Sequence, residues 1–155
     1  MSFTRHLLID GANILHAWPE LRALIKRDRS AARSRLVQSV SVIHDGEEVR
    51  VTLVFDGRGT GLTVERPSGQ PTFSVLYTPS AMTADDLIEQ LVAKSADPAA
   101  CIVATGDRGE RETVEASGAQ VMTPEELAAW VQRVEVRQSA RVGELHRSNT
   151  RKWRK

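Results

Sequence analysis

Four aspartates in this sequence stand at positions from which they could bind one metal ion. Asp10 ends the apolar run HLLID, Asp56 ends VRVTLVFD, and Asp107 comes two residues after ACIVAT. Asp85 lies in the first turn of a helix that we expect to follow another strand. Because the carboxyl ends of parallel strands meet at one edge of a sheet, these four carboxylates are predicted to gather there.

Carboxylates that are crowded together need a compensating positive charge. At a separation of ~4 Å and an effective dielectric constant of about 20, each pair costs about 4 kcal/mol. A hard divalent cation with oxygen ligands relieves this repulsion, and Mg²⁺ takes one or two carboxylates directly while it keeps several waters. A single Asp at a strand end is often only a turn residue or a helix cap. Several at one edge favour a Mg²⁺ or Mn²⁺ site.

Two polar residues beside these acids have structural alternatives. The segment Thr83-Ala84-Asp85-Asp86 has the pattern of a capping box, in which Asp86 serves the cap and Asp85 stays free for the site. Asn13 follows Asp10 by three residues, and its amide could hold a metal-bound water or a phosphate, or could cap the next turn.

The hydrophobic pattern predicts the elements that position these acids. Short apolar runs predict strands over residues 6–10, 49–56, 72–77, 100–105 and 119–122. Helical spacing and capping signals predict helices over residues 31–44, 83–94 and 108–116, and from 124 to the late 130s. Residues 57–71 hold four Gly and two Pro and are predicted to form a long loop. The alternation predicts an α/β fold with a mainly parallel sheet of about five strands and helices on both faces.

The distribution of charge divides the chain in two. Its 155 residues, 41% of them hydrophobic, suit one domain, which we assign to residues 1–138, followed by a basic tail over 139–155. Residues 133–155 carry a net charge of +6, whereas residues 1–132 carry −5. Basic residues around an aromatic ring suit phosphate contacts and base stacking, although a solubilising tail is the alternative. The residues predicted to bind RNA in the tail are Arg147, Arg151, Lys152, Trp153, Arg154 and Lys155.

The sequence predicts a soluble cytoplasmic protein. The N-terminal apolar run is short and meets Asp10 at once, unlike a signal peptide. No run approaches the roughly 18 apolar residues of a membrane span. The single cysteine, Cys101, permits no disulfide within the chain and lies in an apolar run, so we expect a buried thiol.

Four segments of the sequence resemble, in order, the motifs of YacP-like NYN domains, a branch of the PIN-like nuclease superfamily. These segments are LLIDGANILHAWPEL, LVFDGRG, MTADDLIEQLV and VATGDRGERETV, and the resemblance covers roughly residues 5–130. It implies a Rossmann-like, three-layer PIN-like fold and a metal-dependent endoribonuclease activity. Gly106 stands where members of the family usually carry Ser.

The resemblance also implies roles for individual residues. The catalytic and metal-binding acids would be Asp10, Asp85 and Asp107. The residues that support them would be Asn13, Asp56 and Arg108, and we add Asp86, although many members carry an uncharged residue there. Hydrolysis would leave 5′-phosphate and 3′-hydroxyl ends, and the partner would be RNA, either single-stranded RNA or mRNA, with the ribosome as one setting in which members of the family act. The residues expected to hold flanking phosphates are Arg108 and, in the Gly- and Pro-rich segment, Arg58 and Arg66.

Two other functions fit parts of the pattern. A non-catalytic RNA-binding module could keep the same fold, although the intact set of acids argues against it. A phosphatase of the haloacid dehalogenase type also uses an Asp at a strand end, but it needs a second Asp two residues later, where this chain has Ala12. The sequence does not indicate an oligomeric state.

Overall fold

Strands and helices alternate along the chain. The computed structural model describes the backbone of residues 3–153 and the side chains of residues 3–143. In chain order the elements are β1 (His6–Asp10), α1 (Gly11–Ala17), α2 (Pro19–Ile25), α3 (Arg29–Glu47), β2 (Arg50–Phe55), β3 (Thr63–Glu65), β4 (Phe73–Tyr77), α4 (Ala84–Ala93), the 3₁₀ turn η1 (Pro98–Ala100), β5 (Cys101–Ala104), α5 (Arg108–Ala116), β6 (Gln120–Met122) and α6 (Pro124–Trp153).

The order in which the chain adds strands to the sheet reverses at β1. Its six strands lie in the order β3-β4-β2-β1-β5-β6, and every pair is parallel except β3 with β4. The chain builds outward from β1 through β2 to β4, and then crosses back to place β5 on the other side of β1. Such a switch point leaves a crevice at the carboxyl ends of the strands. Asp10, at the end of β1, therefore stands at the centre of that edge.

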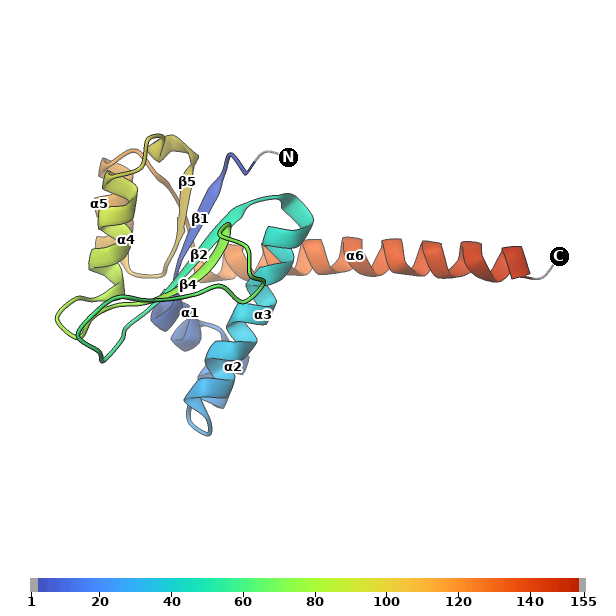
Figure 1. Cartoon of the computed structure of the whole chain (residues 1–155), viewed down its shortest axis with the longest axis horizontal. Helices are drawn as coiled ribbons and strands as arrows, with labels where there is room; N and C mark the ends of the chain where they lie inside the picture. Colours follow the sequence, from blue (N-terminus) through green and yellow to red (C-terminus); the bar gives the residue numbers. More distant parts are fainter. Residues whose placement is uncertain (1–2, 154–155) are drawn as a thin grey trace.

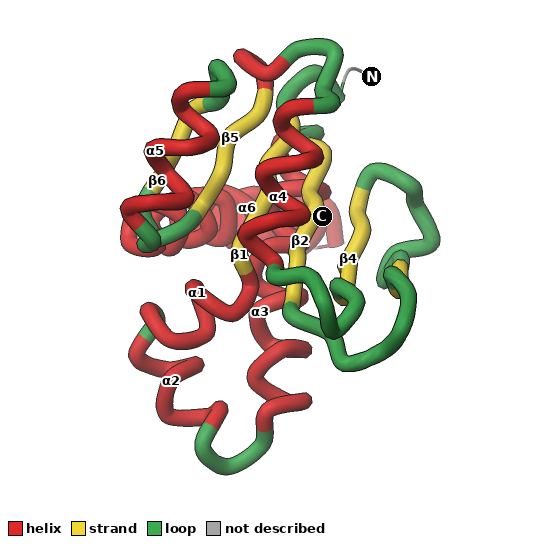
Figure 2. The backbone as a smooth tube through the Cα atoms, turned by 90° about the vertical axis from the view of Figure 1, so that its left-hand side faces the viewer, coloured by secondary structure: helices red, strands yellow, loops and turns green. Residues whose placement is uncertain are grey.

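Helices cover both faces of the sheet (Figures 1 and 2). Leu7 and Ile9 face a core that also holds apolar residues of α1, α2, α3 and α6, whereas Leu8 faces a second core with α4 and α5. Side chains alternate between the faces of a strand, so Asp10, two residues after Leu8, points to the α4–α5 face. The predicted three-layer α/β architecture is thus confirmed.

Short elements account for most of the differences from prediction. Strand β1 and helix α5 have the predicted bounds. The sheet has six strands rather than about five, because β3 lies within the segment that was predicted to be only a loop. All three residues of β3 are exposed and held by pairing with β4, so no apolar pattern marks them. Helices α1 and α2 were also not predicted.

Helix α6 is longer than predicted, because it continues to Trp153 rather than ending in the late 130s. Within the part of α6 whose side chains are described, Val134 is the last apolar residue in the core, and Figure 1 shows the rest of the helix extending away from the body. A polar helical segment has no apolar periodicity by which its end could be recognised. The boundary predicted at residue 138 falls inside α6 and stays a prediction. No helix in the described part of the chain combines the length and hydropathy that crossing a membrane requires.

The side chains expected to bind RNA in the tail belong to the part of the chain that the structure does not describe. The affected predictions are those for Arg147, Arg151, Lys152, Trp153, Arg154 and Lys155.

Candidate functional site

Asp10 is a buried carboxylate at the carboxyl edge of the sheet. It is the last residue of β1, and only 4% of its surface is exposed. Its side chain is the N-cap of α1 and accepts a hydrogen bond of 3.2 Å from the Asn13 N–H. A cap accounts for one of the carboxylate oxygens and leaves the other available to the site.

Glu110 is a second buried acid, and it was not predicted as a site residue. It lies in the first turn of α5 and is 2% exposed. Its Oε2 accepts a hydrogen bond of 2.9 Å from the Thr105 hydroxyl, whereas its buried Oε1 has no hydrogen-bond partner among the described residues. The only signal in the sequence is its spacing, three residues after Asp107, which is also the spacing of an ordinary capping position.

Asp10, Asp85 and Glu110 form an acidic cluster that could hold a cation. Each offers a carboxylate oxygen, and the three oxygens lie within 4.8 Å of one another. They come from β1, α4 and α5. The switch in strand order thus brings Asp10 together with Asp85, 75 residues later, and with Glu110, 100 residues later. An all-oxygen ligand set suits Mg²⁺, Mn²⁺ or Ca²⁺. The buried, unpartnered Oε1 of Glu110 fits this assignment, because such an atom needs a proton or a cation.

The electrostatics of the acidic cluster also favour a bound cation. Burial, followed by contact with Asp85, raises the pKa of Asp10 to about 7. Burial, followed by contact with Asp10, raises the pKa of Glu110 to about 10. Both shifts have the cause expected when carboxyl groups share a desolvated site. A divalent cation inverts this preference, because it stabilises the ionised forms.

Asp107 stands beside the acidic cluster and orients it. Its side chain is the N-cap of α5 and accepts a hydrogen bond of 3.0 Å from the Glu110 N–H. Its own N–H donates to the Thr105 hydroxyl at 3.1 Å. Asp107 does not belong to the group of described acids whose oxygens lie within 4.8 Å. Its role as a direct metal ligand stays a prediction.

Asn13 joins the ends of β1 and β5. Its Oδ1 accepts a hydrogen bond of 2.6 Å from the Gly106 N–H, which leaves its NH₂ group as the end that could donate to a substrate. A Cβ at Gly106 would lie 3.0 Å from this Oδ1 and 3.4 Å from the Pro124 Cγ. The absence of a side chain at Gly106 therefore permits the close contact with Asn13.

Asp56 and Asp86 hold the start of α4, which carries Asp85. The Oδ1 of Asp56 accepts a hydrogen bond of 2.8 Å from the Ala84 N–H. The predicted capping box is present, because Asp86 and Thr83 exchange hydrogen bonds of 3.1 and 3.3 Å. Both acids satisfy backbone donors at the helix start, which supports Asp85 without direct contact with a metal.

The predicted phosphate-binding arginines lie on the surface. Arg108 is 87% exposed and forms an ion pair of 3.3 Å with Glu112, four residues along α5. Such exposed pairs contribute about 0.3–0.5 kcal/mol, so a phosphate could displace Glu112. Arg58 and Arg66 are exposed on the segment between β2 and β4. The structure thus leaves all three accessible, and their contacts with RNA stay predictions.

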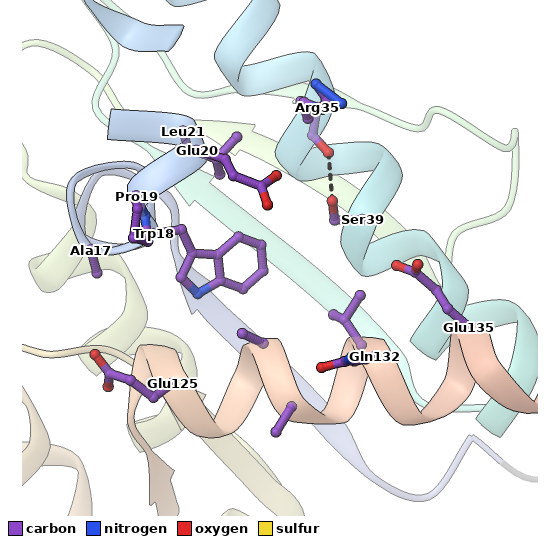
Figure 3. Close-up of a pocket in the computed structure, with 13 residues that line it drawn as sticks. Ala17, Trp18, Pro19, Glu20, Leu21, Arg35, Ser39, Glu125, Gln132 and Glu135 are labelled. Atoms are coloured by element: carbon purple, nitrogen blue, oxygen red, sulfur yellow. Dashed lines mark hydrogen bonds between the residues drawn. The ribbon is translucent and has the colours of Figure 1, made fainter. Parts of the chain in front are cut away.

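A groove on the other face of the sheet from α4 and α5 is lined by none of the predicted site residues. It has a volume of about 580 Å³ and lies between α2, α3 and α6 (Figure 3). Trp18 borders it, and the indole N–H donates to the Pro124 carbonyl at 2.8 Å. This bond attaches the start of α6 to the body, so Trp18 has a packing role.

Comparison with known proteins agrees with this geometry. The family model described as YacP-like NYN domain matches residues 7–155. A protein of Bacillus subtilis (strain 168), described as uncharacterized protein YacP, is 33% identical over 141 residues, which cover 90% of this chain and 82% of the relative.

Crystal structures of Rae1 (YacP) from Bacillus subtilis share the fold. One superimposes with a TM-score of 0.77 at 29% identity, and the match covers 97% of this chain and 84% of the Rae1 chain. A single-substitution mutant of the same protein has the same TM-score and identity and covers 92% of this chain. The match of the family model across almost the whole sequence, together with these relatives, shows that the chain belongs to the YacP-like NYN domains, a family of PIN-like nucleases.

Proposed function

We propose that this protein is a metal-dependent endoribonuclease that hydrolyses phosphodiester bonds in RNA. The observation that carries the proposal is the convergence of three carboxylate oxygens, from Asp10, Asp85 and Glu110, within 4.8 Å at the carboxyl edge of the sheet. Nuclease chemistry is what the family implies, and an oxygen-only site suited to Mg²⁺ or Mn²⁺ is what metal-assisted hydrolysis of a phosphodiester would use.

Asp10, Asp85 and Glu110 would hold the metal, and the surrounding residues would position the substrate. When bound, the metal supplies an activated water and polarises the phosphate that is attacked. Asp107 keeps the start of α5 and Glu110 in place, and its remaining carboxylate oxygen orients water at the rim of the acidic cluster. The NH₂ group of Asn13 and the guanidinium of Arg108 donate to phosphate oxygens on either side of the cleaved bond.

The proposed substrate is single-stranded RNA, including mRNA and its ribosome-bound form. The acidic cluster lies at the carboxyl edge of the sheet, where ligands of parallel α/β sheets bind, and Asp85 is its partly exposed member. The basic C-terminal tail adds a second, sequence-independent contact with the phosphate backbone through Arg147, Arg151, Lys152, Arg154 and Lys155, with Trp153 able to stack on a base.

Cleavage of an end-labelled single-stranded RNA tests the proposed activity. The wild-type protein should cut in Mg²⁺ or Mn²⁺, stop cutting when EDTA is added, and leave 5′-phosphate ends. Asp85→Asn and Glu110→Gln should each lower the rate by at least about 100-fold, because each removes a charged ligand from the acidic cluster. Glu115→Gln, an isosteric change at an exposed position of the same helix as Glu110, is the matched control and should cut normally.

Two results would contradict the proposal. One is cleavage that persists at the normal rate in both site variants. The other is tight RNA binding with no cleavage in any divalent metal, which would instead support a non-catalytic RNA-binding module.

A further inference from the structure

A polar groove lies between α3 and the β3–β4 hairpin, on the sheet face opposite the acidic cluster. Its volume is about 600 Å³. Helix α3 lines it with Ser30, Arg33, Ser34 and Val37, and the hairpin lines it with Glu65, Arg66, Pro67, Val75 and Tyr77. Two of these residues are cationic and one is acidic, which gives the lining a net charge of +1.

Arg33 presents a cation to this groove that is held by aromatic rings rather than by an acid. Its guanidinium carbon lies 5.5 Å from the centroid of the Phe55 ring and 5.8 Å from that of Tyr77. Among the described residues, Arg33 has no salt-bridge partner, and its buried Nε has no hydrogen-bond partner. Cation–π contacts fix the position of the group but leave its N–H donors unused.

The same aromatic rings connect Arg33 with the edge that carries Asp10. Phe55 and Tyr77 are the last residues of β2 and β4, lie opposite each other, and stack with centroids 5.7 Å apart. Phe55 also abuts Gly11, the residue after Asp10, so closely that a Cβ on Gly11 would lie 2.4 Å from its ring. Two strand spacings, roughly 10 Å, separate β1 from β4 across this edge.

We propose that this groove binds the phosphodiester of a nucleotide that flanks the cleaved bond, with Arg33 as its principal cation. The inference rests on the proposed function, since it assigns a second contact for the same RNA strand. Arg33 presents a planar fork of donors, which matches the paired oxygens of a phosphodiester. The hydroxyls of Ser30 and Ser34 and the guanidinium of Arg66 stand in the same lining.

Glu65 is the group in the lining that would oppose an anion. Burial raises the pKa of Tyr77, and the nearby carboxylate of Glu65 raises it further. The two guanidinium groups of the lining, those of Arg33 and Arg66, outnumber this one carboxylate. The charge of Arg33 remains available for the ligand.

Equilibrium binding of RNA to a non-cutting protein tests this groove separately from the activity. The full-length chain carrying Asp10→Asn would be titrated against a fluorescent single-stranded RNA of about 12 nucleotides, in EDTA, over a series of salt concentrations. Adding Arg33→Gln should weaken binding about tenfold, because a charge-assisted hydrogen bond is lost. It should also reduce the slope of log K against log[salt] by about 0.7, the value for one phosphate contact on a single strand.

Two further variants control for charge and folding. Arg35→Gln removes an equal charge from the same helix at an exposed position that lines the groove of Figure 3 instead, and it should leave the affinity within about twofold. Arg66→Gln alters an exposed residue of the proposed groove and should weaken binding in the same sense as Arg33→Gln. If Arg33→Gln fails to fold, as judged by circular dichroism, Arg66→Gln carries the test.

The outcomes for the groove and for the nuclease are distinct. The proposed phosphate site would be wrong if Arg33→Gln folds and leaves the affinity and the salt slope unchanged, even if the wild-type protein cuts RNA. If Arg33→Gln unfolds, the same result for Arg66→Gln would overturn the proposal. Weaker binding in these variants would support the groove even if the wild-type protein proves unable to cut.

Discussion

Individual acidic residues show which members of the candidate metal site could be identified from their positions in the sequence. Asp10 and Asp85 were predictable because one ends an apolar strand and the other stands free of the capping box that follows Thr83. Glu110 was not, because its burial depends on the approach of α5 to β1, which the local sequence does not encode. Asp107, predicted as a ligand, caps α5 and accepts a hydrogen bond from the Glu110 N–H, and its role as a direct metal ligand stays a prediction.

The raised pKa of Glu110 predicts how the stability of the metal-free protein depends on pH. A carboxyl group whose pKa is higher in the folded state contributes stability that is present below its unfolded pKa of about 4.5 and is lost as pH rises toward about 10. Asp10, whose pKa is raised to about 7, adds to this loss in the lower part of the range, so the free energy of unfolding in EDTA should fall by about 3 kcal/mol between pH 6.5 and 8.5. Urea denaturation across this range measures the change.

Two comparisons make this pH prediction specific. Burial and Arg50 lower the pKa of His6 to about 4, so its contribution is lost only as pH falls below 6.5, outside the range chosen. Glu110→Gln should flatten the dependence on pH, whereas Glu115→Gln should not. A wild-type stability that stays constant or rises over this range would contradict the assignment.

At the scale of elements, the helices and strands that could be predicted from the sequence are the ones that bury a periodic apolar face. Helices α4 and α5 and strands β1, β2, β4 and β5 all place apolar residues in the two cores. Strand β3 is exposed along its whole length, and α1 and α2 are each seven residues long, too short to show a clear period. Their formation depends on tertiary contacts that no local pattern reveals.

Glu47 ties α6 to the end of α3, and its replacement should weaken that attachment. Its Oε1 accepts hydrogen bonds of 2.9 Å from the Trp130 indole and from the Arg137 guanidinium. Glu47→Gln should lower the free energy of unfolding at pH 7 by about 1 kcal/mol, because charge-assisted bonds are lost. Glu48→Gln, a change at the exposed next residue, is the control.

The pH dependence separates this effect from a general loss of packing. The Trp130 hydrogen bond is the largest cause of the lowered pKa of Glu47. A lowered carboxyl pKa contributes stability above its unfolded value that is lost as pH falls through the folded value. Wild type and Glu47→Gln should therefore converge as the pH is lowered below the ordinary pKa of 4.5, as thermal unfolding at pH 7 and over a descending acid series can show. A constant difference would contradict the account.

At the scale of the whole molecule, α6 joins a body that contains the acidic cluster to a basic extension. Among the side chains that the structure describes, which end at residue 143, Val134 is the last residue of α6 that the body buries. Deleting residues 144–155 should therefore change the free energy of unfolding by less than about 0.5 kcal/mol. The same deletion removes five Lys and Arg, so RNA binding should weaken and its salt dependence should flatten.

A charge-only variant distinguishes RNA binding by the extension from solubilisation. In the full-length chain, Gln in place of the five basic residues from 147 to 155 should weaken RNA binding as much as the deletion does. Fluorescence anisotropy at several salt concentrations measures both. Unchanged affinity and salt slope in both proteins would leave the extension with a role in solubility alone.

Anomalous diffraction from crystals soaked in Mn²⁺ at pH 8 tests the central claim most directly. We predict one strong peak between the carboxyl groups of Asp10, Asp85 and Glu110, at about 2.0–2.2 Å from oxygens of at least two of them. Glu115→Gln crystals should keep this peak, and Asp85→Asn crystals should lose it. The absence of a peak there in the wild-type protein, or Mn²⁺ bound only at other acids, would contradict the account.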